Sequence, residues 1–508
     1  MITDRRDFLS WSTHGLTATA LMSLLQRDGS LRGADAAAKT LPTQAATPGE
    51  ATDPPPHLAP KCKRVIHVFL CGGMSHLDSF DYKPLLQKYH GQPLPSTEKP
   101  ETFFGKIGLI RKNDWEFQQR GESGLWISDL FPHIAGVADE LTVIRSMIAD
   151  SANHTPATFQ ANTGFRLNGF PVLGSWLSYG LGCETDDLPA YVVLPDPRGF
   201  PAGGTINWSN GFLPARHQGV AFRTKGQPID DLFPTWIGRA GADVRKSQGT
   251  DVPRSEGELF DSEAERETRE FVAAINRRHQ VTRPESDLAA RIKSYELAAK
   301  MQLSVPRVTD LAGETAATQE AYGLNRDETA EFGRSCLLAR RLLEQGVRFV
   351  QLFAGGSFGS PRINWDGHES VKENHTQEAL RVDQPVATLL RDLRQRGMLD
   401  DTLVLFTTEF GRTPFAQSEA NTVGGGRDHN MYGFSVWMAG GGLKHGISYG
   451  STDDVGWKSV DKPVYWHDFH ATVLNLLGID HQRLTYYHNG IERRLTNVHG
   501  EVVHDLLA

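Results

Sequence analysis

Carboxylate, guanidinium and imidazole side chains gather in one stretch of the chain, residues 402–430. An apolar run at 403–406 is typical of a buried strand, and Glu409 and Arg412 follow it closely. A glycine-rich turn then leads to three more polar residues, Arg427, Asp428 and His429. Groups of these types at this spacing could bind a metal ion, an anion, or both. An exposed turn with an ion pair would account for the same residues.

Polar residues also follow three other predicted strands, at 65–71, 142–147 and 347–353. In an open α/β sheet the carboxyl ends of the strands border the crevice where ligands bind. After the last of these strands, Asp366 and His368 can reach one cation, because an extended backbone sends alternate side chains the same way. The recurrence of histidines and carboxylates at several strand ends therefore predicts a shared site.

The other two strands are followed by His76, Asp78 and His154. Each could be a metal ligand, and His154 could also act as an acid or a base. Asp78 would instead be a helix cap if the chain enters a helix near Pro84. Capping by a neighbour such as Asn153 is the alternative for the loop that holds His154.

The hydrophobic pattern predicts the elements that must position these residues. Two further strands are predicted, at 191–194 and 434–438. Helices are predicted at 131–141, 156–163, 172–181, 263–278, 286–301, 330–345, 376–396 and 466–477. Over 508 residues this order indicates one large α/β domain with insertions, or two domains. We expect the domain at 61–508, with a loop-rich insertion at about 195–251 and added helices at about 257–303.

The amino terminus is typical of an export signal, which we place at residues 1–38. Paired arginines, Arg5 and Arg6, precede a weakly apolar segment at 16–25 and small residues at 34–38. The arginine pair indicates the twin-arginine route, and hence a periplasmic or extracellular protein. The apolar segment is far shorter than the ~20 residues that span a bilayer, so no transmembrane anchor is expected. A short amphipathic helix is the alternative, and a Pro- and Ala-rich linker follows at 39–60.

Composition excludes two other classes of protein. The formal net charge is -8 and no long basic tract occurs, which argues against a nucleic-acid partner. The four cysteines are widely spaced and include no CxxC pair. They therefore define neither a zinc knuckle nor a disulfide framework, although one bridge could form.

Several motifs together resemble the secreted family known as domain of unknown function 1501. They are GGMSHLDSFDYKP, NHTPA, NTGF, GSWLSYGLG, NWDGH, TTEFGRTP, GRDHN, YGFSVWMAGGG and LTYYHNG, and they cover nearly the whole chain from Lys63 onward. That family is similar to sulfatases of the alkaline phosphatase superfamily. The resemblance implies an α/β fold with a mixed, largely parallel sheet between helical layers, and a metal-assisted hydrolytic site.

The resemblance also shows where this chain departs from a sulfatase. The span at 154–158 matches the sulfatase nucleophile motif, and Thr163 and Gly164 match the Thr-Gly that follows it. His154 stands in place of the nucleophile, and Thr158 in place of the motif's arginine. This makes attack by metal-activated water easier to defend than a covalent intermediate.

The superfamily's two-metal plan fits the chain in part. For one metal the matching residues are Asp366, His368 and His429. For the other they are Asp78 and Glu409, but Phe410 stands where a histidine would bind. The second metal site is then incomplete, or includes His76 or His154.

The sequence thus predicts an exported metal-dependent hydrolase of sulfate or phosphate esters. Mixed histidine and carboxylate ligands favour zinc or manganese over calcium. His154 would be catalytic, and Arg412 or Arg427 would neutralise charge on the transferring group. The expected substrate is an anionic small-molecule or polysaccharide ester. The alternative is a non-catalytic sulfatase-like protein that binds anionic polysaccharide, which loss of the nucleophile favours.

Overall fold

The computed structural model describes residues 56–95, 100, 102–225, 228–229, 263–282, 286–356, 358 and 362–508. The predicted export signal at 1–38 lies outside the described residues, as do most of the linker and parts of the two predicted insertions. Within the described part, none of the helices has the length and apolar character needed to cross a bilayer.

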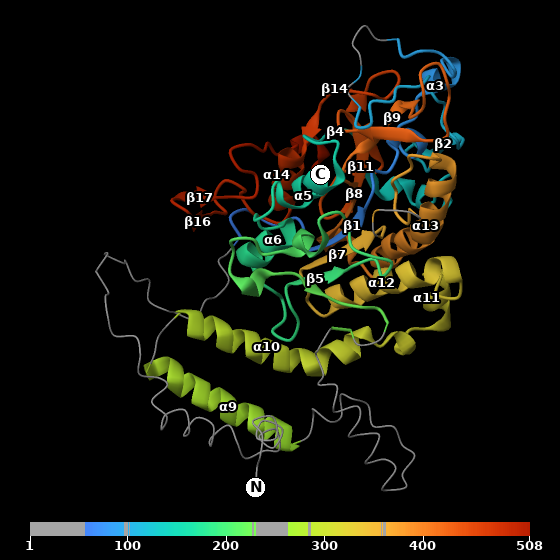
Figure 1. Cartoon of the computed structure of the whole chain (residues 1–508). Coiled ribbons are helices and arrows are strands. Elements are labelled where there is room, and N and C mark those ends of the chain that lie inside the picture. Colours follow the sequence, from blue (N-terminus) through green and yellow to red (C-terminus); the bar gives the residue numbers. More distant parts are fainter. Residues whose placement is uncertain are drawn as a thin grey trace, which may run out of the picture. The chain divides into compact units, whose positions relative to one another are not determined.

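A mixed nine-stranded sheet forms the centre of the domain, in the order β12-β4-β11-β8-β1-β7-β5-β6, with β15 beside β4 (Figure 1). The strand β1 (Arg64–Leu70) runs parallel to both of its neighbours, β7 (Phe349–Ala354) and β8 (Thr402–Thr408). Next to β8, β11 (Phe434–Gly440) is antiparallel both to β8 and to β4 (Leu141–Ile148). The remaining strands are parallel to their partners: β5 (Tyr191–Leu194), β6 (Val220–Ala221), β12 (Ile447–Tyr449) and β15 (Val464–Tyr465).

This pairing places the carboxyl ends of β1, β4, β7 and β8 at one edge of the sheet. These are the four strand ends at which the sequence predicted polar residues. The predicted mixed, largely parallel sheet between helical layers is confirmed.

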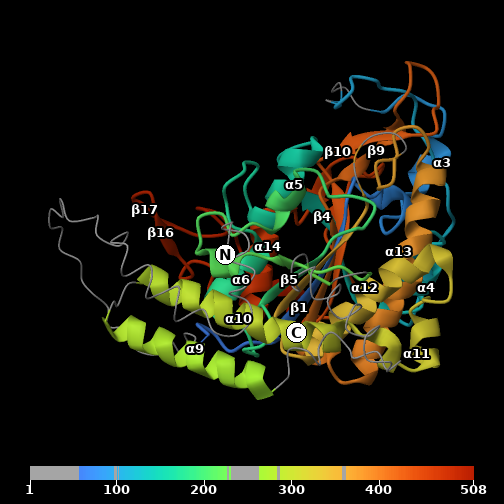
Figure 2. The same cartoon turned by 60° about the horizontal axis from the view of Figure 1, so that its bottom comes forward.

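Helices cover both faces of the sheet, which is why its strands are nearly continuous apolar runs (Figure 2). Alternate residues of β1 enter different cores: Ile66 and Val68 pack on one side, and Val65 and Phe69 on the other. The first core includes α12 (Asp327–Glu344) and α13 (Val371–Gln395). The second includes α6 (Leu173–Leu181) and α14 (Trp466–Leu476).

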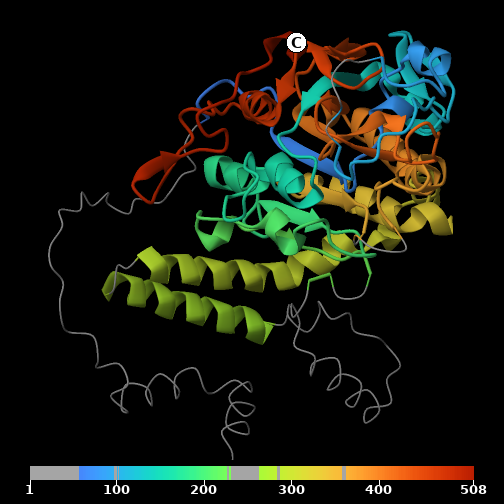
Figure 3. The ribbon, with the colours of Figure 1, turned by 45° about the horizontal axis from the view of Figure 1, so that its top comes forward.

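Several predicted helices differ in length from the structure. The region predicted as a helix at 131–141 contains only the short α4 (Pro132–Ala135) and a 3-10 turn at Ala138–Glu140. Gly136 ends α4, where its N–H bonds back to the carbonyls of the preceding turn. The helices α9 (Glu263–Thr282) and α10 (Ser286–Thr309) are longer than predicted and lie side by side (Figure 3).

The smaller elements lie at the periphery of the sheet. The described part of the predicted loop-rich insertion holds two 3-10 turns, Gly204–Trp208 and Ala215–His217, besides β6. Three hairpins pair β2 (Phe117–Arg120) with β3 (Leu125–Ser128), β13 (Ser451–Thr452) with β14 (Ser459–Asp461), and β16 (Tyr486–His488) with β17 (Ile491–Arg493). Two short helices are α3 (Pro84–Lys88) and α11 (Ala316–Ala321).

Two histidines lie deep in the second core, and both are held neutral. His67 of β1 bonds through Nε2 to the Thr407 hydroxyl at 2.7 Å, and His470 of α14 bonds to the Ala161 carbonyl at 2.9 Å. Burial lowers the pKa of each imidazole from 6.5 to about 3. The unfolded chain therefore takes up protons below pH 6.5 that the folded chain does not, and the free energy of unfolding should fall as the pH falls through this range.

At pH 5.5 each of these histidines should cost about 1.4 kcal/mol of stability relative to pH 7.5. His470→Gln keeps a donor for the Ala161 carbonyl but removes the titration. Urea unfolding at the two pH values should therefore show a loss about 1.4 kcal/mol smaller in this variant than in wild type. His445→Gln, at an exposed position, should behave as wild type. An unchanged pH dependence in His470→Gln would contradict the assignment.

Candidate metal centre

Asp366 is held against the end of β1 by the backbone of its own loop. The Trp365 N–H donates to the Cys71 carbonyl at 2.8 Å, which brings the loop beside Gly72. Gly72 has a φ of +119°, and a Cβ there would lie 2.6 Å from the Asp366 nitrogen. Only glycine tolerates both this backbone conformation and this approach, so Gly72 allows the Asp366 loop to lie against the end of β1.

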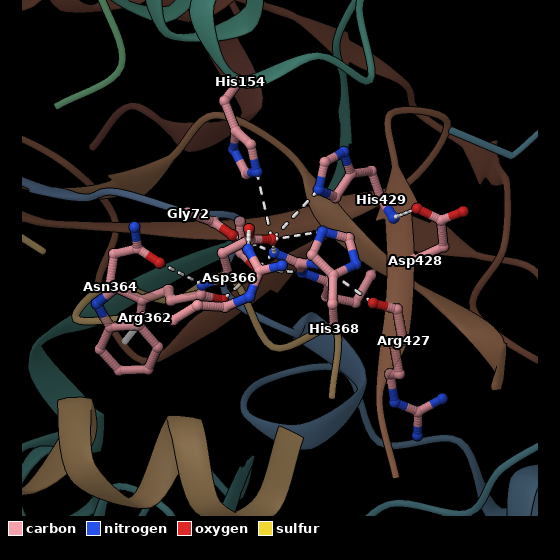
Figure 4. A network of polar contacts seen from close by, with 12 residues as sticks. Gly72, His154, Arg362, Asn364, Asp366, His368, Arg427, Asp428 and His429 are labelled. Atoms are coloured by element: carbon pink, nitrogen blue, oxygen red, sulfur yellow. Dashed lines mark hydrogen bonds and ion pairs between the residues drawn. The ribbon is translucent and has the colours of Figure 1, made fainter. Parts of the chain in front are cut away.

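Three imidazoles converge on the Asp366 carboxylate (Figure 4). The Nε2 atom of His368 lies 2.7 Å from Asp366 Oδ1, and the Nε2 atoms of His154 and His429 each lie 3.3 Å from the same oxygen. One ligand atom from each of the four residues lies within 4.8 Å of the other three. Three nitrogen donors and one oxygen donor this close together could hold a metal ion.

The three histidines come from separate elements. His154 is the first residue of α5 (His154–Thr163), and Asn153 caps that helix by accepting the Thr155 N–H. His429 lies on β10 (Arg427–Asn430), which forms a hairpin with β9 (Gly411–Ala416) just beyond β8. Asn153 is thus the helix cap, while the next residue, His154, directs its Nε2 atom toward Asp366.

Each imidazole is fixed through its other nitrogen. His154 Nδ1 lies 2.7 Å from Glu409 Oε1, and His429 Nδ1 lies 2.5 Å from the Ala152 carbonyl oxygen. His368 Nδ1 bonds to the side-chain oxygen of Gln417. An acceptor at Nδ1 can hold the tautomer in which Nε2 keeps its lone pair, and that tautomer is the form of histidine that binds a metal.

Charged groups around the cluster keep Asp366 ionised. Burial raises the pKa of its carboxyl group, but Arg412 and the three histidines outweigh burial and hold this pKa well below its usual range. Burial lowers the pKa of His429 well below its usual value. For His154 burial acts in the same direction, but the Asp366 and Glu409 carboxylates outweigh it and raise the pKa.

Asp78, predicted as a metal ligand, is placed in a different buried cluster. Its Oδ2 lies 3.0 Å from Arg427 Nε and accepts the Ser75 hydroxyl at 2.6 Å. Its Oδ1 accepts the Asp114 N–H at 3.0 Å. Both members of the Asp78–Arg427 pair are fully buried. Arg427 neutralises Asp78, so neither residue faces the four-donor cluster.

His76 is also separate from the cluster, because its Nε2 lies 2.8 Å from the Gly456 carbonyl oxygen. Arg412 does reach the cluster, at 2.7 Å from Asp366 Oδ1, but its other hydrogen bonds go to backbone carbonyls such as Gly73 O at 2.7 Å. Its side chain is completely buried. Arg412 therefore positions Asp366 and has no free face toward a substrate.

Glu409 lies behind His154 rather than in the four-donor set. Its Oε1 accepts the Gly72 N–H at 2.8 Å in addition to contacting His154, and its Oε2 accepts the Thr408 hydroxyl at 3.2 Å. Phe410, beside it in the sequence, packs its ring 5.0 Å from that of His154 and 4.5 Å from that of His429. The Glu-Phe pair thus supports two candidate ligands without supplying one.

The chain matches the family described as "Protein of unknown function (DUF1501)" over residues 62–507. It belongs to this family. No curated protein matches the chain.

Solved structures similar to this DUF1501 protein include a lipoteichoic acid synthase, a sulfatase and an alkaline phosphatase. The lipoteichoic acid synthase LtaP from Listeria monocytogenes is 11% identical, with 84% of this chain and 75% of that chain covered and a TM-score of 0.35. The PsFucS1 sulfatase from Pseudoalteromonas sp. is 13% identical, with 88% and 72% covered and a TM-score of 0.35. A mutant of TAB5 alkaline phosphatase is 10% identical, with 82% and 99% covered and a TM-score of 0.31. At such low scores, the chemistry of the DUF1501 protein has to come from its own residues.

Two residues that make polar contacts with the cluster, Arg362 and Gln417, were not predicted from the sequence. Arg362 Nη1 bonds to Asp366 Oδ2, and Arg362 Nε donates to Glu369 at 2.8 Å. Arg362 lies four residues before Asp366, in the loop that the sequence already singled out, and this spacing was its available signal. Gln417 lies in the β9–β10 loop, and nothing in its sequence context pointed to His368.

Glu409→Gln is expected to lower the metal affinity of the DUF1501 protein by roughly 10- to 100-fold, because the carboxylate fixes and polarises His154. Metal titration against a competing chelator would measure it. Glu419→Gln is the matched control, since Glu419 is exposed and pairs with Lys106. Equal affinities in the two variants would show that Glu409 does not act through His154.

Proposed function

We propose that this protein is a metal-dependent hydrolase of sulfate or phosphate esters. His154, Asp366, His368 and His429 would hold one divalent ion. The observation that carries this proposal is the convergence of three Nε2 atoms on one carboxylate oxygen, while each opposite Nδ1 is held by an acceptor. We propose zinc or manganese rather than calcium, because calcium prefers oxygen ligands throughout.

The residues present fit such an ion. Three imidazoles and a carboxylate are common donors to zinc. The Nε2 atom of His154 is buried, and the Asp366 oxygen 3.3 Å away is a contact too poorly aligned to count as a hydrogen bond. A buried nitrogen that is not hydrogen-bonded costs free energy, and a bound cation would remove that cost.

An ion bound here would supply Lewis-acid activation of the ester and of a water molecule. The chain's own residues would prepare the site for it. Asp366 is ionised before any ligand arrives, since Arg412 and the histidines lower its pKa. Glu409 orients His154, and Phe410 fills the space beneath the imidazoles.

Arg362 is the best placed guanidinium group for contact with an anionic substrate. Its side chain is 28% exposed beside the cluster, whereas those of Arg412 and Arg427 are completely buried. Turning Arg362 from Glu369 toward a bound anion would exchange one charged hydrogen bond for another. We therefore assign to Arg362 the charge-neutralising role that the sequence suggested for the two buried arginines.

Attack by water suits this site better than attack by a side chain. His154 occupies the position that resembles the sulfatase nucleophile. Ser75, which together with Thr155 offers a hydroxyl group that could serve as a nucleophile, is fully buried and donates its hydroxyl hydrogen to Asp78. A hydroxyl committed to a buried carboxylate of another cluster has no access to a substrate at Asp366.

The second candidate function is a non-catalytic binding protein for anionic polysaccharide. One observation favours it: Arg412 already lies 2.7 Å from the Asp366 oxygen on which the histidines converge. The cluster could thus be held together by this ion pair without a metal.

For either function we propose an exported protein, because Arg5 and Arg6 form the arginine pair of a twin-arginine signal. Replacing both arginines by lysine should block its export.

Metal content and turnover of aryl sulfate and aryl phosphate, measured on wild type and Asp366→Ala, would test the proposal. We expect metal and activity in wild type and the loss of both in the variant. Asp505→Ala, at an exposed carboxylate, serves as control. A protein that is metal-free and inert toward both esters would end the hydrolase proposal, and a metal-loaded but inert one would favour the binding protein.

A further inference from the structure

We propose that Phe103 and Phe104, together with Phe358, form a subsite for a flat hydrocarbon group on the ester, so that aryl esters are preferred. This inference rests on the proposed function for the reacting end of the substrate. Each candidate metal-binding imidazole has a phenylalanine ring beside it. Ring centroids are 5.0 Å apart for Phe103 and His429, 4.9 Å for Phe104 and His368, and 4.4 Å for Phe358 and His154.

The first two rings are strongly exposed, which sets them apart from the core. The exposed fraction is 45% for Phe103 and 50% for Phe104, and the two rings meet edge to face at 4.9 Å. Single exposed apolar residues are common, but two adjacent rings that pack directly against candidate ligands form a patch continuous with the site. A substrate bound at the histidines would cover this patch.

The segment that carries these rings is tied to the site by a hydrogen bond. The Phe104 N–H donates to Asp428 Oδ2 at 3.1 Å, and Asp428 Oδ1 accepts the His429 N–H at 2.8 Å. One buried carboxylate therefore links the aromatic segment to the strand that carries a candidate ligand. The rings are held at the metal centre by a contact that does not involve their own side chains.

The chemistry of the rings selects the group that they would cover. Phenylalanine has no donor or acceptor, so it contributes nothing to the recognition of sugar hydroxyls. Offset or edge-to-face contact with an aromatic ring is favourable beyond the area that it buries. An aryl group directly attached to the ester would lie within reach of the rings while its anionic end lies at the histidines.

The test uses two non-hydrolysable ligands, phenylphosphonate and methylphosphonate, titrated calorimetrically into the metal-loaded full-length protein. We expect wild type to bind phenylphosphonate at least about tenfold more tightly. Phe103→Ala/Phe104→Ala should lose most of that preference, with unchanged affinity for methylphosphonate and unchanged metal content. Phe200→Ala is the matched control, because Phe200 is 52% exposed and packs near Trp208 instead.

Equal affinity of wild type for the two phosphonates would overturn the subsite. A double variant that lost affinity for both ligands alike would also overturn it, as would a protein that bound neither. Failure of the proposed function has a different signature, namely absence of metal or of ester turnover. A phenyl preference that persisted without turnover would sustain the subsite and refute the hydrolase.

Discussion

Asp366→Asn should lower metal affinity by more than about 100-fold and destabilise the protein by about 3 kcal/mol or more. The substitution keeps the shape of the side chain but removes its charge. Asp366 supplies the oxygen on which the three histidines converge, so the metal affinity should fall. Arg412, which is completely buried beside it, would lose the one carboxylate that it contacts among the described residues, so the stability should fall as well.

Metal content after equilibrium dialysis and urea unfolding would measure the two effects separately. Asp505→Asn is the control, since it removes the same charge from an exposed surface pair. If Asp366→Asn retained wild-type affinity, the carboxylate would serve Arg412 alone. If it retained wild-type stability, the ion pair with Arg412 would be of little consequence, and the two outcomes can be told apart.

Arg427→Met is expected to destabilise the protein by about 3–5 kcal/mol, because it leaves the Asp78 carboxylate buried without a cation. Asp78→Asn should also destabilise it but should retain the metal, since Asp78 lies outside the four-donor cluster. Unfolding in urea measures the first effect, and metal analysis the second.

The double variant Asp78→Asn/Arg427→Met should lose less free energy of unfolding than the sum of the losses in the two single variants, because it removes both charges.

The exposed pair Lys106 and Glu419 provides the control for this cycle. Its double variant Lys106→Met/Glu419→Gln should change stability by less than about 1 kcal/mol, as for other surface ion pairs. Loss of metal in Asp78→Asn to the extent seen in Asp366→Asn would mean that Asp78 is a ligand after all.

The sequence was most informative where burial imposes a pattern. Apolar runs located the central strands, because strands covered on both faces have few alternatives. Polar residues after four of these strands then located the edge where Asp366, His368 and His154 meet. His429 could be included in the site because it lies in the segment that follows the same strand as Glu409. No other element was predicted between that strand and β11.

The sequence could not assign partners among buried charges. Asp78 and Glu409 each come after a predicted strand, yet Asp78 meets Arg427 while Glu409 meets His154. Which partner each carboxylate meets depends on the β9–β10 hairpin, whose two strands were not predicted from the sequence. Phe103 and Phe104 were missed for a related reason, because their loop has no periodicity and is placed by contacts with distant residues such as Asp428.

Anomalous diffraction from crystals grown with zinc tests the central claim most directly. We expect one strong peak about 2.0–2.2 Å from the Nε2 atoms of His154, His368 and His429 and from an oxygen of Asp366. Crystals of His368→Ala/His429→Ala should lack that peak. A wild-type map with no peak between these residues, or with the ion beside Asp78 instead, would contradict it.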